Sequence, residues 1–137
     1  MTSKTNLAYF NAAKAISKHS DHPQYKLGCV VVDRHKIISS GANSRSRTHG
    51  LQARIDTEHF GCTCPGYKHA EVDALLPLIK KGVDLSKASI YVYREHKNGT
   101  LALARPCARC EALLRKYKIK RVFYTVESGF AQEKWKL

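Results

Sequence analysis

The first third of the chain contains two clear patterns of hydrophobic and polar residues. Near the start, apolar residues recur every three positions at Leu7, Phe10, Ala13 and Ile16, and Lys4, Lys14 and Lys18 fall outside that set. This spacing predicts an amphipathic helix over residues 7–16. Pro23 and the polar residues before it should end that helix, because proline cannot continue a helix and disfavours helical geometry in its predecessor.

Two strands are expected next. Residues 27–32 are rich in β-branched residues and almost continuously apolar, as in a strand buried on both faces, and residues 36–40 form a second strand after a turn at 33–35. We interpret Cys29 as a small buried hydrophobe. From residue 42 to residue 67 the periodicity is lost, which predicts a long loop.

The second half predicts a further series of helices and strands. A helix is expected over 69–81, ending at Gly82, then a strand over 89–95. Asn98-Gly99 is typical of a hairpin turn and should be followed by a returning strand over 100–103. A third helix should start at Pro106 and end in the basic run 115–121. Residues 122–126 form another strand, and 127–137 are expected to form one short helix bearing Phe130 and Trp135.

Four residues in two of these segments carry chemistry. His69 and Glu71 stand at the start of one expected helix, and Cys107 and Cys110 stand at the start of the next. One histidine and two cysteines are three ligands for zinc, and a catalytic zinc site leaves its fourth position to water. A carboxylate two residues from the histidine suits a proton carrier better than a structural site. The pattern therefore indicates a catalytic zinc.

The expected reaction follows from that open position. Zinc lowers the pKa of a bound water toward roughly 7, so hydroxide becomes available at neutral pH. Glu71 can take the proton of this water and pass it first to a ring nitrogen and then to a departing amine. The reaction that this arrangement implies is a hydrolytic loss of ammonia.

Together the segments His69-Ala70-Glu71 and Pro106-Cys107-Ala108-Arg109-Cys110 resemble the signature of the cytidine and deoxycytidylate deaminase superfamily. The resemblance implies that His69, Cys107 and Cys110 hold one zinc and that Glu71 is the proton shuttle. It also implies that the backbone near Ala70 binds the base and that Asn43 contacts the sugar. The implied fold is α/β: a three-layer sandwich with a mixed central sheet flanked by helices. Periodicity alone predicts only a small α/β domain, and the family's fifth strand is expected to be missing.

The charge of the chain changes the expected partner. The 24 Lys and Arg residues outnumber the 11 Asp and Glu residues, which gives a net charge of +13 and favours a partner rich in phosphate. The resemblance places the long loop beside the substrate, so Arg45 or Arg47 should meet a phosphate. Arg105 could reach a phosphate or a base carbonyl, or turn to solvent.

The basic run in which the third helix ends has two interpretations. It could be a phosphate track for single-stranded nucleic acid, or its cations could satisfy the carbonyl end of the helix. The residues concerned are Arg115, Lys116, Lys118, Lys120 and Arg121.

A separate cluster of possible ligands lies in the long loop. His59, Cys62 and Cys64, with His49, could hold a second, structural zinc, but the spacing of the two cysteines is tight for one tetrahedral ion. We favour free, partly buried thiols here.

Length and composition complete the prediction. The 137 residues suit one domain over 1–137. No membrane span or secretory signal is expected, and five cysteines suit a reduced compartment, so we expect a soluble intracellular protein, cytoplasmic or, in a eukaryote, nuclear.

Three functions are open at this point. The first choice is a deaminase of cytosine in single-stranded DNA or RNA, supported by the charge. The alternatives are a deoxycytidylate or cytidine deaminase of nucleotide metabolism, and a non-catalytic zinc-stabilised module that binds nucleic acid. Cytosine is favoured over adenine on the resemblance alone.

Overall fold

The computed structural model describes residues 3–23, 25–45 and 68–136. Within them the chain forms one five-stranded sheet with the strand order β2-β1-β3-β4-β5. The elements along the chain are α1 (Lys4–Ser17), β1 (Leu27–Asp33), β2 (Lys36–Ala42), α3 (Ala70–Lys80), β3 (Ser89–Arg94), α4 (Ala108–Lys116), β4 (Arg121–Val126) and β5 (Gly129–Lys134).

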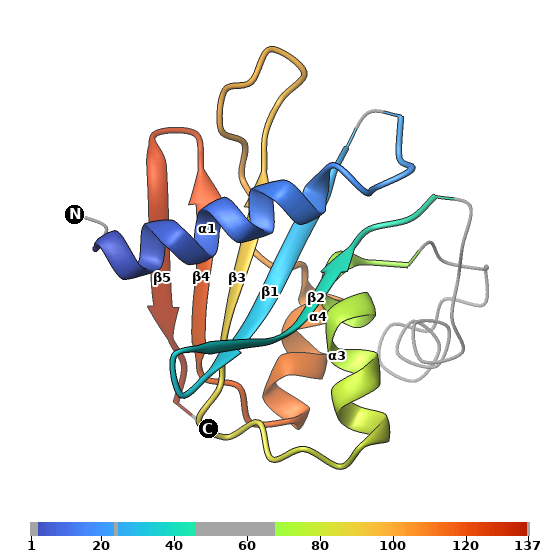
Figure 1. The fold of residues 1–137 in the computed structure, drawn as a ribbon, viewed down its shortest axis with the longest axis vertical. Coiled ribbons are helices and arrows are strands. Elements are labelled where there is room, and N and C mark those ends of the chain that lie inside the picture. Colours follow the sequence, from blue (N-terminus) through green and yellow to red (C-terminus); the bar gives the residue numbers. More distant parts are fainter. Residues whose placement is uncertain (1–2, 24, 46–67, 137) are drawn as a thin grey trace.

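The sheet is mixed and covered on both faces. Strands β3 and β4 are parallel, whereas the other neighbouring pairs are antiparallel. Helix α1 crosses one face of the sheet, and α3 and α4 lie against the other (Figure 1). The expected α/β sandwich of three layers is therefore confirmed.

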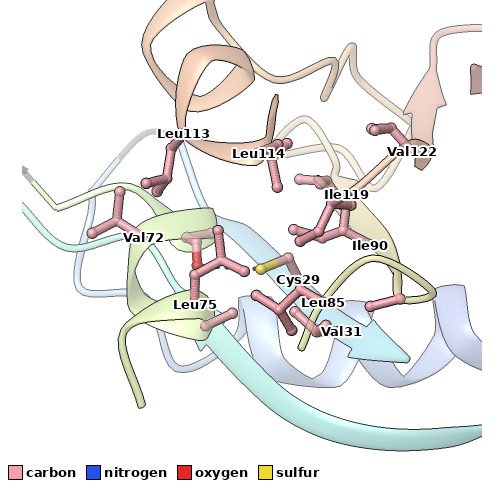
Figure 2. Packing of buried hydrophobic residues seen from close by; sticks show 14 of the residues in the cluster. Cys29, Val31, Val72, Leu75, Leu85, Ile90, Leu113, Leu114, Ile119 and Val122 are labelled. Atoms are coloured by element: carbon pink, nitrogen blue, oxygen red, sulfur yellow. Dashed lines mark hydrogen bonds between the residues drawn. The ribbon is translucent and has the colours of Figure 1, made fainter. Parts of the chain in front are cut away.

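Strand β1 shows how the sequence builds two cores from one sheet. Val30 and Val32 pack with Phe10 on the α1 side. Cys29 and Val31, which alternate with them, belong to the larger core under α3 and α4. Figure 2 shows side chains from both of these helices pointing into that core. A strand buried on both faces needs the continuous apolar run that the sequence has at 27–32.

Helix α3 lies unusually close to the sheet because of a glycine. A Cβ atom placed on Gly41 of β2 would be 2.4 Å from the Ala74 nitrogen and 2.5 Å from the Ala70 carbonyl oxygen. A residue without a side chain is needed where two backbones approach in this way. This contact fixes the start of α3, which carries His69 and Glu71.

The expectation of a C-terminal helix without a fifth strand is wrong. Residues 129–134 form β5, which pairs antiparallel with β4 from Arg121↔Lys134 to Val126↔Gly129. Phe130 faces the α1 side, with its ring 4.5 Å from that of Phe10. The segment Gly129–Lys134 has few β-branched residues, so local propensity did not predict it, and pairing with β4 decides its conformation.

Two expected boundaries also change. The turn at Asn98-Gly99 forms, but Thr100–Leu103 makes only an isolated bridge, Glu95↔Leu101, and no returning strand. The third helix begins after Cys107, so Pro106 precedes it, and it ends at Lys116, before most of the basic run. Ile119 is buried in the larger core and leads the chain directly into β4.

Two other expectations concern a membrane span and a second zinc site. In the described ranges, no helix combines the length and apolar character that crossing a membrane requires. The suggested second zinc cluster at His49, His59, Cys62 and Cys64 lies outside the described residues, as does Arg47.

Candidate functional site

The starts of α3 and α4 meet at one end of the sheet. His69 is the residue immediately before α3, and Cys107 is the residue immediately before α4; both have extended backbone geometry. Cys110 follows in the first turn of α4. The free N–H groups at a helix start carry partial positive charge, which favours thiolate and carboxylate groups beside them.

The three side chains are close enough to share one metal ion. The His69 Nδ1 atom lies 3.6 Å from Cys107 Sγ and 3.3 Å from Cys110 Sγ, and all three ligand atoms lie within 4.8 Å of one another. Tetrahedral zinc with Zn–N near 2.0 Å and Zn–S near 2.3 Å separates its ligands by about 3.5 Å. The donor set and its spacing therefore fit one zinc.

The two thiols differ in how readily they ionise. A hydrogen bond with Cys110 and contacts with His69 hold the pKa of Cys107 well below its usual range. The same thiol pair and burial raise the pKa of Cys110. Zinc binds cysteine as thiolate, so binding of the ion to this pair is coupled to loss of the thiol protons.

Glu71 lies inside the site rather than at its surface. Its side chain belongs to the first turn of α3, and only 3% of the residue is exposed. Burial raises the pKa of Glu71, while the neighbouring His69 opposes that rise. A carboxyl group with a raised pKa can both accept and return a proton near neutral pH.

A cavity of about 320 Å³ opens beside these residues, which is a suitable size for a small ligand. Its lining brings together the ends of β2 and β3, the start of β1 and the starts of the two helices. The lining residues are His22, Tyr25, Leu27, Asn43, Ser44, Lys68, His69, Ala70, Glu71, Arg94, Leu103, Ala104, Arg105 and Cys107.

The expected substrate-binding residues differ in whether they line this cavity. Asn43 and Ala70 line the cavity, but Asn43 also accepts a hydrogen bond from the Leu27 N–H (2.8 Å) and donates one to the Tyr25 carbonyl (2.6 Å). Asn43 therefore joins the end of β2 to the start of β1. Arg45 is exposed, is held through its backbone N–H by Asp21 (2.7 Å), and is not among the lining residues.

Arg105 lines the cavity but is engaged by carboxylates. Its Nε donates to Glu133 Oε2 at 2.6 Å, and its terminal nitrogen donates to Glu111 at 2.9 Å. Glu133 also accepts from the Tyr124 hydroxyl (2.7 Å) and the Trp135 indole N–H (3.2 Å). Arg105 is exposed, but these two carboxylates largely balance its charge. These bonds tie β5 to the segment that carries Cys107.

Several cavity residues have no signal in the sequence. His22 lines the cavity and accepts a hydrogen bond from the Tyr25 N–H at 2.9 Å. Lys68 and Arg94 also line it, at the end of an undescribed segment and at the end of β3. Only the position of Arg94 at a strand end, where α/β sites gather, could have suggested it.

The cations of the basic run, which begins in the last turn of α4, have different surroundings. Arg115 pairs with Glu111 at 3.1 Å and lies over the Trp135 ring at 4.5 Å. Lys116 lies over the Tyr117 ring. Lys118 is exposed, and Lys120 and Arg121 line a different cavity, at the opposite end of the sheet. None of these five residues lines the cavity beside Glu71.

Comparison with known proteins agrees with this geometry. Residues 3–126 match the family model described as the cytidine and deoxycytidylate deaminase zinc-binding region. A deoxycytidylate deaminase from Mycobacterium phage D29 is 29% identical over 131 residues, which is 88% of this chain and 93% of that protein.

Solved structures share the fold. The cytidine deaminase from Burkholderia pseudomallei has a TM-score of 0.65 at 18% identity, covering 98% of this chain and 93% of its own. The dCMP deaminase from the cyanophage S-TIM5 has a TM-score of 0.61 at 22% identity, both in its apo form and in complex with dCMP and dUMP. The two forms cover 90% of this chain and 84% and 82% of theirs.

The ligand set can be tested by the loss of metal. We expect Cys110→Ser to weaken zinc binding at least about 100-fold, because a hydroxyl does not replace a thiolate as a zinc ligand. Cys29→Ser is the matched control: the buried Cys29 thiol donates to the Ala70 carbonyl at 3.2 Å and stands outside the ligand group. Zinc affinity is measured by competition with a chelating dye. Wild-type affinity in Cys110→Ser would contradict the assignment.

The carboxylate network of Glu133 should show in acid. Hydrogen bonds from Arg105 and Tyr124 hold the pKa of Glu133 at about 2, below its value of about 4.3 in an unfolded chain. Such a group stabilises the fold above its unfolded pKa and loses that contribution as the pH falls through the folded pKa. We expect Glu133→Gln to lower the free energy of unfolding by about 1 kcal/mol at pH 7.

The difference between this variant and the wild type should shrink as the pH falls from about 4.5 toward 2, measured by urea unfolding. Glu127→Gln is the control, because that carboxylate is 76% exposed and, among the described residues, is paired with the His96 ring alone, at 3.4 Å. A Glu133 difference that does not change with pH would contradict the role of this network.

Proposed function

Because the chain belongs to the cytidine and deoxycytidylate deaminase zinc-binding family and is a zinc-dependent hydrolase of that family, we propose that it deaminates a free cytosine nucleotide, with deoxycytidylate as its preferred substrate. The matched relatives favour this alternative over the first choice of cytosine in single-stranded nucleic acid. The phage D29 relative, a deoxycytidylate deaminase, aligns with this chain over most of both proteins, and the cyanophage dCMP deaminase structure is a complex with dCMP and dUMP.

The roles of the site residues follow from their positions. His69, Cys107 and Cys110 would hold the zinc. When bound, the zinc would lower the pKa of a water molecule to roughly 7. Glu71 accepts a proton from the attacking water and transfers it to the ring nitrogen beside the carbon under attack. It then takes the second proton from the same oxygen, now bonded to that carbon, and delivers it to the departing amine, which leaves as ammonia. The amide nitrogen of Ala70 and the polar wall around Asn43 are the groups that we assign to the base and sugar.

The single observation that favours a phosphorylated substrate is the charge of the cavity wall. Its described lining residues include three cations, Lys68, Arg94 and Arg105, against one carboxylate, Glu71. Lys68 is paired with Asp73 at 2.8 Å, and Arg105 is paired with Glu111 and Glu133. Within the described ranges Arg94 has no carboxylate at ion-pair distance.

Arg94 is nevertheless held in place. Its Nη1 donates to the Leu103 carbonyl at 3.2 Å, and its guanidinium lies 4.8 Å from the centre of the Tyr25 ring. A fixed guanidinium without a carboxylate partner is well suited to bind a phosphate. We therefore assign the 5′-phosphate to Arg94 rather than to the expected Arg45 or Arg105.

The proposal is tested by comparing substrates side by side. Zinc-loaded protein is incubated with dCMP, deoxycytidine, cytidine and a cytosine-containing single-stranded oligonucleotide, and the uracil products are quantified. We expect dUMP from dCMP, with a kcat/KM at least tenfold above that for either nucleoside. Product from the oligonucleotide alone would overturn the nucleotide assignment.

We also expect Glu71→Gln to keep its zinc and lose about 10²–10⁴-fold in kcat.

Arg94→Gln separates recognition of the phosphate from the chemistry. We expect KM for dCMP to rise about 10–100-fold, as for the loss of a charged hydrogen bond, while deoxycytidine kinetics change less than about twofold. Lys97→Gln removes an equal charge from a residue that does not line the cavity and serves as the control. Equal losses with both substrates in Arg94→Gln would contradict a phosphate contact.

A further inference from the structure

A second region of concentrated positive charge lies at the opposite end of the sheet. The reaction cavity includes the start of β1 and the end of β3, whereas this region surrounds the starts of β3 and β4 and the end of β5 (Figure 1). A cavity of about 400 Å³ is lined there by Ser86, Lys87, Ala88, Lys120, Arg121 and Lys134. A neighbouring cavity of about 380 Å³ shares Lys87 and Arg121 and adds Arg34 and His35.

We call this region the basic end and define it by Arg34, Lys87, Lys120, Arg121 and Lys134. Asp33 is the one acidic residue among the described lining residues of the two cavities. In the part of the chain that the structure describes, none of the five cations forms a salt bridge. Hydrogen bonds from Ser86, and to a smaller extent the charge of Lys87, lower the pKa of Asp84, but this carboxyl lines neither cavity.

The register of the sheet places two of these cations against each other. Arg121 of β4 stands directly opposite Lys134 of β5. Like charges at directly opposed positions destabilise an antiparallel pair. Lys120, next in the chain to Arg121, adds a third cation to the same cavity. An anionic partner would remove this repulsion.

The backbone near the basic end is also unusual. Among the described residues, positive φ outside glycine occurs at Arg34 (51°), His35 (64°) and Lys118 (66°). Arg34 and His35 form the two-residue turn between β1 and β2, where asparagine and glycine are the residues that such a turn prefers. Lys118 lies just beyond α4, on the way to Lys120. Three basic residues therefore occupy positions whose conformation favours other residue types.

Aromatic rings adjoin the cations. Tyr9, Tyr91 and Phe123 line the second cavity, and Tyr9 and Phe123 are partly exposed. The Tyr91 and Phe123 rings stack at 4.3 Å, and Tyr9 lies 5.1 Å from Tyr91. Cations beside accessible rings are the combination that binds single strands, because phosphates contact the cations and unpaired bases stack on the rings.

We propose that the basic end binds single-stranded nucleic acid at a surface separate from the reaction cavity. Its phosphates lie along Lys87, Lys120, Arg121 and Lys134, and its bases stack on Tyr9 and Phe123. This inference concerns a different surface and does not rest on the proposed substrate. It assigns the cations Lys120 and Arg121 to binding and leaves Arg115 to the network with Glu111 and Trp135.

The experiment uses fluorescence anisotropy with a labelled oligothymidylate and the zinc-loaded full chain. Thymine carries no exocyclic amine, so the probe is not a deamination substrate. The test variant is Lys120→Gln/Arg121→Gln/Lys134→Gln. The matched control is Lys18→Gln/Lys26→Gln/Lys97→Gln, which removes the same charge from three exposed lysines of another cavity, beside Glu95.

We expect the test variant to bind at least tenfold more weakly than wild type, and the slope of log affinity against log salt to fall by about 2, since single strands give roughly 0.7 per phosphate contact. The control should lose less than threefold. Tyr9→Ala should weaken binding about fivefold or more without changing the salt slope. Turnover of dCMP should be unchanged in both triple variants, so failure here is distinguishable from failure of the proposed substrate.

Three results would overturn the proposal. The first is equal weakening of binding in the two triple variants, and the second is no binding of the oligonucleotide by the wild type at physiological salt. The third is displacement of the labelled probe by tripolyphosphate at the same concentration as by unlabelled oligonucleotide. The first would mean a response to net charge only, and the last would mean a site for small polyphosphates. Thermal unfolding of the test variant is measured in parallel; relief of the Arg121–Lys134 repulsion should leave its Tm unchanged or raised.

Discussion

The close packing of α3 and α4 on one face of the sheet is the constraint on which the site depends. Neither helix carries a complete set of metal ligands: one brings His69 to its start, and the other brings Cys107 and Cys110. The buried apolar faces of both helices hold them in the same core, and Gly41 lets α3 approach β2 at backbone distance. The ligand separations of 3.3 and 3.6 Å follow from this packing.

What the sequence predicted well depends on short-range patterns. The periodicity around Leu7–Ile16 and the apolar run of β1 predict their elements because burial repeats along the chain with the period of each structure. The spacing of His69, Glu71, Cys107 and Cys110 predicts the metal group because zinc accepts few donor sets. The predictions for β5 and for the segment Thr100–Leu103 were wrong for the opposite reason. The conformation of each depends on whether it pairs with a strand that is distant in sequence.

The cavity wall shows a second limit of sequence reasoning. Whether an arginine is available to a substrate depends on the carboxylates that the fold brings near it, and these are remote in sequence. Arg105 and Glu133 are 28 residues apart, yet their side chains bond at 2.6 Å. His22 and Arg94 reach the same cavity from separate elements. A count of basic residues predicts attraction for phosphate but does not identify which cations are already paired.

Strand β5 also affects the tendency of the protein to self-associate at high concentration. β4 carries the run Val122-Phe123-Tyr124-Thr125-Val126, which has high β propensity and no charge. Without β5, one edge of that run would offer unpaired N–H and C=O groups to other molecules, as edge strands that aggregate do. β5 covers this edge with a short strand bearing Gln132, Glu133 and Lys134. The same segment that anchors Arg105 therefore acts as a shield against self-association.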